Sequence, residues 1–380
     1  MPRVSPRGAA LMVACMPVTT RVAAQAIEGF ALNLLLTTEA LQPPEIRALN
    51  LQSHVQTTIL QYDLGDIVRL GGDRQHTDGR NRTLRPHGLV LRSGTLADTI
   101  YWADAGAGAI LGMRFDQSGI RIMQRGLSQP EHLVLDAAET ALAAGGPLLY
   151  WGDSVTNRIQ RCRIVGDEGN AGTCSGLTDV HTGTNMIAGL ALVGGRLIWA
   201  DGVDQRILSG ALDASGRMIA ASIRVLVPFV EIPVALGSAD AAGNTLLFLD
   251  QATPTTLSRV SLDGNASLVV KYGLSRPHAL AFTAQGYTFI TDSGRRRVFT
   301  FPTGEEVPTL VTVFEGSGSF EPRGAALRDD ARVRLPVAEY GIPRVSSAGC
   351  ARRGASHAGA AGGLVGVAMA CLAIRSGSRR

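Results

Sequence analysis

One short phrase recurs along this chain: an apolar or aromatic run closed by an aspartate. The clearest copies are Tyr101-Trp-Ala-Asp104, Tyr150-Trp-Gly-Asp153 and Trp199-Ala-Asp201, and weaker copies end at Asp250 and Asp292. The aspartates are 49 (104 to 153), 48 (153 to 201), 49 (201 to 250) and 42 (250 to 292) residues apart. A fixed period of roughly 40–50 residues with strand signals predicts a propeller or another repeat array.

Each repeat carries the signals of four short strands. A stretch that is often led by proline, such as Pro86–Leu91, comes first, and the aromatic phrase comes second. An aliphatic stretch follows the aspartate, and after an Asp-Gly type of turn a fourth strand is expected, as at 222–227 and 267–270. Four short strands per repeat are typical of a propeller blade. Because one blade cannot bury both of its faces, neighbouring blades must stack.

Five repeats carry the aspartate phrase, and a degenerate sixth unit lies upstream at Leu34–Glu39 and Glu45–Leu51. This unit lacks a first strand, whereas Pro322–Leu327 is a first strand with no repeat after it. We expect the late strand to join the first unit, because closure of the ring removes exposed strand edges. The predicted fold class is therefore all-β, a six-bladed β-propeller of four-stranded blades over residues 28–330.

These residues resemble the YWTD (LDL-receptor class B) repeat family, whose signature is a Tyr-Trp-Thr-Asp phrase followed by an isoleucine strand and a Leu-Asp-Gly turn. The likeness is good at Tyr101–Asp116 and Tyr150–Ile164, readable at Trp199–Asp213 and weak in the later repeats. The resemblance implies a six-bladed extracellular binding module without chemistry of its own. The flanking cysteine-rich modules of such receptors do not fit a chain with five cysteines, so receptor-specific activities do not transfer.

The repeated aspartates have two interpretations, a ring of catalytic carboxylates or a repeated element of the scaffold. The resemblance implies the second, in which each aspartate bridges neighbouring blades through hydrogen bonds. A buried carboxylate needs such partners, and backbone amides of the adjacent blade can supply them. We expect this structural role for Asp104, Asp153, Asp201, Asp250 and Asp292.

Composition is compatible with a folded β protein that has no nucleic-acid partner. The chain has 380 residues, 45% of them hydrophobic, and 45 glycines that suit many tight turns. The net charge of +4 is mild and the basic residues are scattered. No patch of interleaved aromatic and basic residues indicates nucleic-acid binding.

Both ends of the chain carry possible targeting signals. Residues 1–26 predict a signal peptide, with a transit peptide or a disordered basic leader as the alternatives. Residues 358–374 lack charges and predict a short transmembrane helix, with a low-complexity Gly/Ala tail as the alternative. Residues 331–357 would form a stalk and 375–380 a short basic tail. This arrangement predicts a type I protein of the cell surface or a secretory-pathway membrane, or a secreted protein if 358–374 does not span.

The cysteines and glycosylation sequons are compatible with an oxidising compartment. Cys162 and Cys174 flank a turn-rich stretch and could form a hairpin disulfide, or could remain free thiols. Cys350 has no obvious partner. Asn81 and Asn265 lie in sequons within expected loops and are candidate glycosylation sites.

The position after each strand-leading proline is expected to line one mouth of the central channel. Those residues are His87, Glu131, Val234, His278 and Arg323, and the matching position of the fourth repeat is undefined. Because calcium needs six to eight oxygen ligands, a ring with one carboxylate is a poor calcium cage. We therefore predict no metal and no cofactor, with calcium needed only under an enzymatic alternative.

Two functions follow. The first is a non-enzymatic, membrane-anchored ectodomain that binds a protein ligand on one propeller face. The second is a channel-centred hydrolase or lactonase, similar to the lactonases and strictosidine-synthase-like proteins that share a six-bladed fold. A cluster of carboxylates and amides in the channel would favour the enzyme, and an exposed apolar patch on one face would favour the binding module.

Overall fold

The computed structural model describes residues 33–38, 44–51, 55–62, 84–92, 98–114, 120–137, 145–166, 171–238, 244–263, 267–283, 286–303, 309–316 and 320–328. The chain divides into two compact units, Met1–Gly341 and Ile342–Arg380, and every described residue belongs to the first. The predicted signal peptide, stalk, transmembrane helix, basic tail and both sequons lie outside the described residues. Within the described part, no helix is long and apolar enough to cross a membrane.

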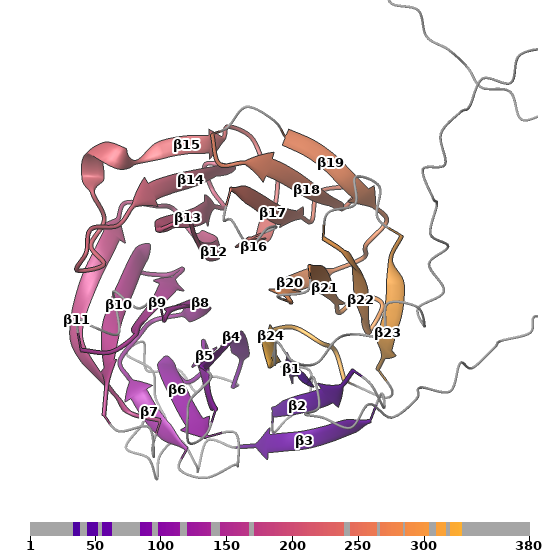
Figure 1. Ribbon diagram of the computed structural model, residues 1–380, viewed down its shortest axis with the longest axis horizontal. Coiled ribbons are helices and arrows are strands. Elements are labelled where there is room, and N and C mark those ends of the chain that lie inside the picture. Colours follow the sequence, from indigo (N-terminus) through magenta and orange to yellow (C-terminus); the bar gives the residue numbers. More distant parts are fainter. Residues whose placement is uncertain are drawn as a thin grey trace, which may run out of the picture. The chain divides into compact units, whose positions relative to one another are not determined.

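The described strands form six four-stranded antiparallel sheets arranged around a central channel, which is a β-propeller (Figure 1). The first sheet has the order β24 (Ala325–Arg328), β1 (Asn33–Thr38), β2 (Glu45–Asn50), β3 (Gln56–Gln61). The second contains β4 (Pro86–Arg92), β5 (Thr99–Asp104), β6 (Ala109–Arg114) and β7 (Arg121–Gln124). The third contains β8 (Pro130–Asp136), β9 (Leu148–Asp153), β10 (Arg158–Val165) and β11 (Thr173–Thr182).

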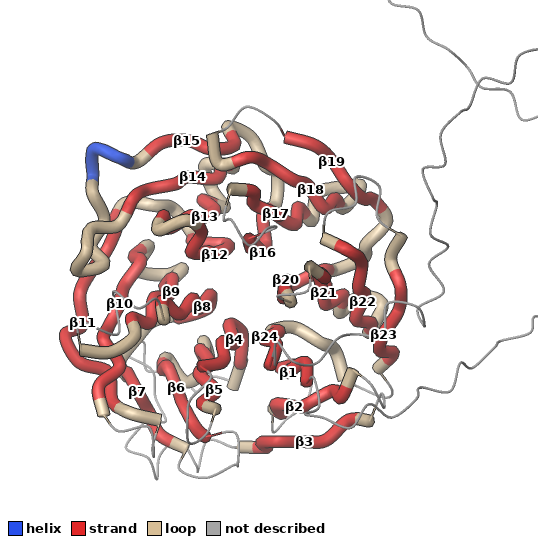
Figure 2. Tube along the Cα trace, viewed as in Figure 1, coloured by secondary structure: helices blue, strands red, loops and turns tan. Residues whose placement is uncertain are grey.

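The remaining three sheets repeat the same order from the channel outward. The fourth contains β12 (Ile187–Val193), β13 (Arg196–Asp201), β14 (Arg206–Ala211) and β15 (Arg224–Val227), and a short 3-10 helix, η1 (Ala220–Ser222), precedes β15 (Figure 2). The fifth contains β16 (Pro233–Ser238), β17 (Thr245–Asp250), β18 (Thr256–Ser261) and β19 (Ser267–Tyr272). The sixth contains β20 (Pro277–Phe282), β21 (Tyr287–Asp292), β22 (Arg297–Pro302) and β23 (Val311–Glu315).

The two ends of the described chain meet in the first sheet. β24 pairs with β1 in antiparallel register, with Leu34 opposite Leu327 and Leu36 opposite Ala325. β24 also packs against β4 of the second sheet and β20 of the sixth. The C-terminal strand therefore supplies the innermost strand of the first sheet and leaves no open edge at that point of the channel.

The aromatic phrase forms the second strand of its sheet, and neighbouring sheets cover both faces of that strand. Every residue of β5, β9 and β21 is buried. A strand covered on both sides has a nearly continuous apolar sequence rather than an alternating one. This explains why the phrase is the strongest sequence signal of each repeat.

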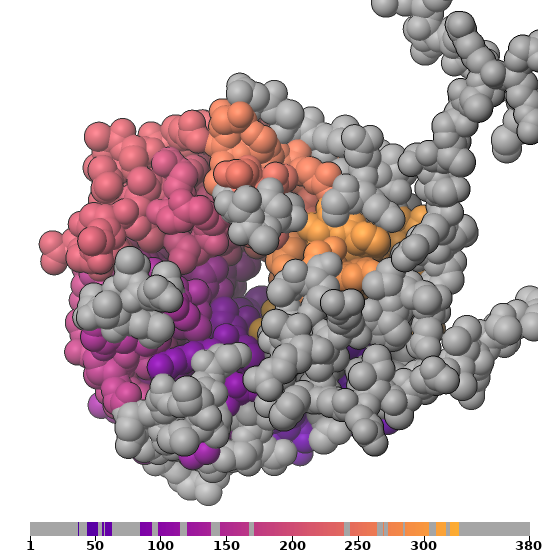
Figure 3. Space-filling view, viewed as in Figure 1, coloured from indigo at the N-terminus to yellow at the C-terminus, as the bar shows by residue number. Residues whose placement is uncertain are grey.

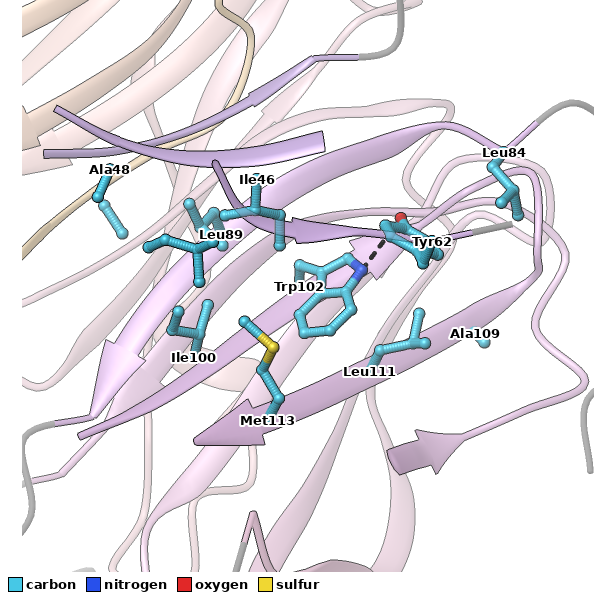
Figure 4. Close-up of a cluster of buried hydrophobic side chains, with 12 residues drawn as sticks. Ile46, Ala48, Tyr62, Leu84, Leu89, Ile100, Trp102, Ala109, Leu111 and Met113 are labelled. Atoms are coloured by element: carbon cyan, nitrogen blue, oxygen red, sulfur yellow. Dashed lines mark hydrogen bonds between the residues drawn. The ribbon is translucent and has the colours of Figure 1, made fainter. Parts of the chain in front are cut away.

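The hydrophobic core is divided into clusters that lie between neighbouring sheets. In Figure 4, Ile46 of the first sheet faces Ile100 and Trp102 of the second. The indole of Trp102 also lies against the ring of Tyr62, which follows β3, with ring centroids 5.8 Å apart. Each buried tryptophan thus packs between two adjacent sheets. Burial of such large side chains contributes strongly to the stability of the ring.

Candidate functional site

The five repeated aspartates lie where the second strand of each sheet turns into the third. Asp153 shows the common pattern most fully. Its Oδ2 accepts the backbone N–H groups of Ser128 (2.8 Å) and Gln129 (3.2 Å), which link the second sheet to the third. Its Oδ1 accepts those of Val155 (3.2 Å) and Thr156 (3.0 Å) in the turn after β9. The carboxylate therefore joins the inter-sheet link to the turn of its own sheet.

Asp250 and Asp292 repeat this arrangement. Asp250 accepts the backbone N–H groups of Glu231 and Ile232, at 3.1 and 2.8 Å. Asp292 accepts those of Ser275 and Arg276, at 2.8 and 2.9 Å. Each carboxylate accepts hydrogen bonds from backbone amides of the segment that connects the preceding sheet to its own. These carboxylates therefore have a structural role.

Asp104 uses a side chain of the preceding sheet as well. It accepts hydrogen bonds from the backbone N–H groups of Arg85 (2.9 Å) and Ala107 (2.8 Å) and from the Tyr62 hydroxyl (2.7 Å). Burial raises the pKa of this carboxyl, and the hydrogen bonds oppose that rise because they favour the charged form.

Asp201 departs from the pattern. It accepts the backbone N–H of Asp204 (3.0 Å), and its Oδ2 lies 3.6 Å from the Arg206 guanidinium. The backbone of Met186, in the segment before β12, forms other hydrogen bonds. Its carbonyl accepts from the Gly202 N–H (2.9 Å), and the Met186 N–H donates to the Asn157 side chain (2.9 Å). Met186 has a φ of 59°, a left-handed conformation that costs a non-glycine residue free energy.

Figure 3 shows a hollow at the centre of the ring. A cavity of about 360 Å³ lies at the end of this channel where the inner strands begin, next to the aspartates with which their first residues pair. All four polar residues that the sequence placed there line it: His87, Glu131, His278 and Arg323. Val234 also lines the cavity, and Ala188 occupies the matching position of the fourth sheet. These side chains come from the entrances to the innermost strands of the six sheets.

Irregular strand pairing aims these side chains into the channel. The register between first and second strands shifts at Pro86/Leu89, Pro130/Leu133, Ile187/Gly189, Pro233/Ala235 and Pro277/Ala279. Proline has no N–H to donate to the ladder, and a bulge leaves residues unpaired and redirects their side chains. The lining residues His87, Glu131, Ala188, Val234 and His278 occupy these unpaired positions.

Apolar side chains near the start of each innermost strand also line the cavity. The third residue after each strand entrance is a leucine in five sheets and an alanine in the first: Leu89, Leu133, Leu190, Leu236, Leu280 and Ala325. The second residue is small in most sheets because the inner strands nearly touch there. A Cβ on Gly88 would lie 2.3 Å from the Glu131 carbonyl oxygen, and one on Gly324 would lie 2.1 Å from the His87 carbonyl oxygen.

The exception at this second position is His132. Burial lowers the pKa of its imidazole to about 4, the nearby Glu131 carboxylate opposes the shift, and His87 adds to it. His132 is therefore neutral at neutral pH and can both donate and accept a hydrogen bond. No sequence pattern predicts His132 in the channel, because regular alternation along the strand would turn its side chain away.

The polar residues occupy one side of the mouth and apolar residues the other. His278, Arg323, His87 and Glu131 belong to the sixth, first, second and third sheets in succession around the ring. The fourth and fifth sheets supply Met186, Ala188, Ile232 and Val234. The described residues contain no group of three His, Cys, Asp or Glu side chains placed to hold a metal ion.

An apolar patch extends outward from the apolar side of the mouth. We define it as Val155, Met186, Val203, Phe229 and Ile232, which lie in the turns and links of the third to fifth sheets on the aspartate face. Phe229 is 68% exposed and Val203 62%. Contacts tie the segments together: Val203 N–H donates to the Asn185 carbonyl (3.3 Å), and Val230 N–H donates to the Gln205 carbonyl (2.7 Å). Single exposed apolar residues are ordinary, but a group of them in neighbouring turns and links of one face is typical of an interaction surface.

Cys162 and Cys174 form a disulfide that joins β10 to β11. Cys162 is buried in the core between the second and third sheets. The bond lies in the outer half of the third sheet and takes no part in the channel mouth.

Comparisons with known proteins show the fold. No protein-family model matches the chain, and no curated protein matches its sequence. A chain of the nidogen/laminin complex superimposes with a TM-score of 0.58 at 17% identity, over 78% of this chain and 98% of that one. Virginiamycin B lyase of Staphylococcus aureus has a TM-score of 0.46 at 13% identity, over 78% of this chain and 90% of that one. A streptogramin B lyase has 0.49 at 13%, over 80% and 89%. The protein is thus a β-propeller protein.

Proposed function

We propose that this chain is a non-enzymatic binding protein of the extracellular face, in which the six sheets are the six blades of a YWTD-type propeller. Its aspartate face would hold a protein ligand, and residues 358–374 would anchor it in the membrane. The observation that carries the proposal is the apolar patch, because a group of exposed apolar side chains on one face is typical of a binding surface.

The patch has the composition of a binding centre. Phe229 projects an aromatic ring from the link between β15 and β16, and aromatic side chains are enriched among the residues that dominate interface energies. Met186, in the link that enters the fourth sheet, has a left-handed backbone conformation. A strained, exposed apolar residue persists only where the surrounding structure enforces it, which is common at ligand sites.

Charged groups border the patch as the polar rim of an interface would. Asp204 pairs with Arg206 at 2.6 Å, and Glu231 lies beside Phe229. Interfaces typically have an apolar centre within a polar margin. The nidogen/laminin complex shows a chain of the same fold in complex with a protein, which supports this kind of use. No observation among the described residues favours the hydrolase alternative.

A surface cross-linking experiment tests the binding face. The full-length tagged chain is expressed in secretory cells, and cross-linked proteins are compared between wild type, the double variant Val203→Ser/Phe229→Ser, and Val55→Ser. Val55 is 58% exposed in the turn between β2 and β3, at the opposite end of the strands. We expect wild type and Val55→Ser to share a partner that the patch variant loses. Identical partners for all three proteins would overturn the assignment of the face.

Membrane anchoring and glycosylation are tested on the same cells. We expect the chain to require detergent for extraction and to shift in mobility on glycosidase treatment, with Asn81→Gln and Asn265→Gln each removing part of the shift. A soluble, unshifted product would overturn the anchored-ectodomain proposal and leave the apolar patch to be tested on its own.

A further inference from the structure

We propose that the cavity at the channel mouth binds a small amphipathic carboxylate, with its anionic group on Arg323 and its hydrocarbon part against Met186, Ile232 and Val234. This site shares Met186 and Ile232 with the apolar patch, but binding of a small molecule in the cavity does not require a protein ligand on the face. The inference comes from the asymmetry of the mouth, which has one polar side and one apolar side.

Arg323 is fixed by its backbone at the point where the ring closes. Its N–H donates to the Thr37 carbonyl (2.9 Å), and its carbonyl accepts from the Thr291 hydroxyl of the sixth sheet (2.8 Å). The next residue, Gly324, donates to Thr37 Oγ1 (2.8 Å). Three hydrogen bonds from two sheets therefore hold the base of this arginine. The backbone that carries the guanidinium is therefore held in place at the mouth of the channel.

The polar neighbours of Arg323 suit a carboxylate. His278 and His87 lie on the sheets to either side, and the His278 Nε2 is 2.9 Å from the Ser293 hydroxyl. Glu131 lies one sheet beyond His87, where its Oε1 accepts a 2.7 Å hydrogen bond from the Gln129 amide. A planar guanidinium binds a carboxylate through two parallel hydrogen bonds, which is stronger than a neutral contact.

The apolar side and floor set the rest of the ligand. Met186, Ile232 and Val234, from the fourth and fifth sheets, form an apolar wall, and leucines of five sheets also line the cavity. The volume of about 360 Å³ is near the lower end of the range of roughly 300–1,000 Å³ for small-molecule sites. An inorganic anion would leave this apolar wall in contact with water, so the chemistry favours a carboxylic acid with an aromatic ring or a short branched chain.

Calorimetric titration of the full-length protein tests the proposal with phenylacetate as the probe, phenylacetamide as its neutral match and inorganic phosphate as a plain anion. We expect saturable binding of phenylacetate, at least roughly ten-fold weaker binding of the amide because it lacks the charge-assisted bonds, and no displacement by phosphate. Equal binding of acid and amide, displacement by phosphate, or no binding of phenylacetate at millimolar concentration would each overturn the proposal.

Two variants locate the site. Arg323→Gln keeps the backbone anchor and should weaken phenylacetate by about ten-fold or more, whereas Arg295→Gln, an exposed arginine in the turn after β21, should change it less than about two-fold. Val234→Phe fills the apolar side and should abolish binding while leaving Arg323 in place. Thermal unfolding of each variant verifies that it is folded. Unchanged affinity in both Arg323→Gln and Val234→Phe would place the probe elsewhere and refute the inference.

Discussion

The hydroxyl of Tyr62, just beyond the first sheet, donates a 2.7 Å hydrogen bond to the buried carboxylate of Asp104 in the second. The same oxygen accepts a 3.1 Å bond from the indole N–H of Trp102. In the third, fifth and sixth sheets the aspartate is held by backbone amides, so this junction depends on side chains more than those three do. Its stability should therefore respond to substitution and to pH.

Substitution of Tyr62 by Phe should destabilise the propeller by about 1.5–3 kcal/mol at pH 7, because a buried carboxylate loses a hydrogen-bond donor. The bond from Tyr62 lowers the pKa of Asp104, while burial raises it. Removal of the hydroxyl raises that pKa further, because the lost hydrogen bond stabilised the ionised form of Asp104 more than its protonated form. The destabilisation should shrink as the pH falls into the range in which Asp104 takes up a proton. Urea unfolding at several pH values measures this.

Tyr101→Phe is the matched control. The Tyr101 hydroxyl donates to the neutral Ala171 carbonyl at 3.0 Å. Its removal should give a loss of stability of about 0.5–1.5 kcal/mol that does not depend on the ionisation of a partner. If the two variants show the same pH profile, ionised Asp104 is not the group that Tyr62 stabilises.

The three buried tryptophans of the repeated phrase should differ in their response to Phe. Trp102 Nε1 donates to Tyr62, and Trp199 Nε1 donates to the Thr184 hydroxyl at 2.9 Å, but Trp151 Nε1 has no hydrogen-bond partner among the described residues. Truncation of the ring removes similar packing in each case. Trp151→Phe should therefore destabilise the protein by about 1 kcal/mol less than the other two, because it also removes an unpaired buried donor. Equal losses in urea unfolding would contradict this.

Much of the fold was predictable because its signals are local. The buried second strand records its two covered faces in a continuous apolar run, as in Tyr101 and Trp102. Proline marks the entrance of most innermost strands, and this allowed His87, Glu131, His278 and Arg323 to be placed at one channel mouth before the structure was known. The fourth repeat starts with Ile187 in place of proline, so no proline in the sequence marks Ala188 as its lining residue.

What the sequence could not provide depends on irregular or long-range geometry. His132 faces the channel because pairing is interrupted between Pro130 and Leu133, whereas a regular strand would alternate it away. Met186 and Phe229 are apolar residues in links between sheets, and their exposure follows from the packing of distant segments. No local pattern distinguishes such residues from core residues.

Reduction of the Cys162–Cys174 disulfide should lower the unfolding free energy by about 2–3 kcal/mol. The cysteines are 12 residues apart in sequence, and a cross-link that closes a loop of this length restricts the unfolded chain by about that amount. Thermal unfolding before and after mild reduction, with free thiols counted, measures the change. Reduction of the intact side chains avoids the cavity that Cys162→Ala would leave in the core. An unchanged midpoint after complete reduction would contradict the expectation.

His132 should make the propeller less stable as the pH falls from about 6.5 to about 4. Its pKa is lowered from 6.5 to about 4 in the folded protein, chiefly by burial. Between these values the unfolded chain binds a proton that the folded chain does not, so stability decreases with falling pH in this window and levels off below it. The full difference is at most about 3 kcal/mol, since one pKa unit corresponds to about 1.36 kcal/mol and channel water screens part of it.

His132→Gln tests this assignment because it keeps a polar side chain of similar length without a titrating group. The variant should show a flatter dependence of unfolding free energy on pH between 7 and 5 than wild type. In proton NMR spectra of the wild type, the imidazole signal absent from the variant should keep a constant shift from pH 8 to 5. A midpoint near 6.5 for that signal would show that the imidazole is well hydrated. The mouth of the channel would then hold more water than its leucine-lined cavity indicates.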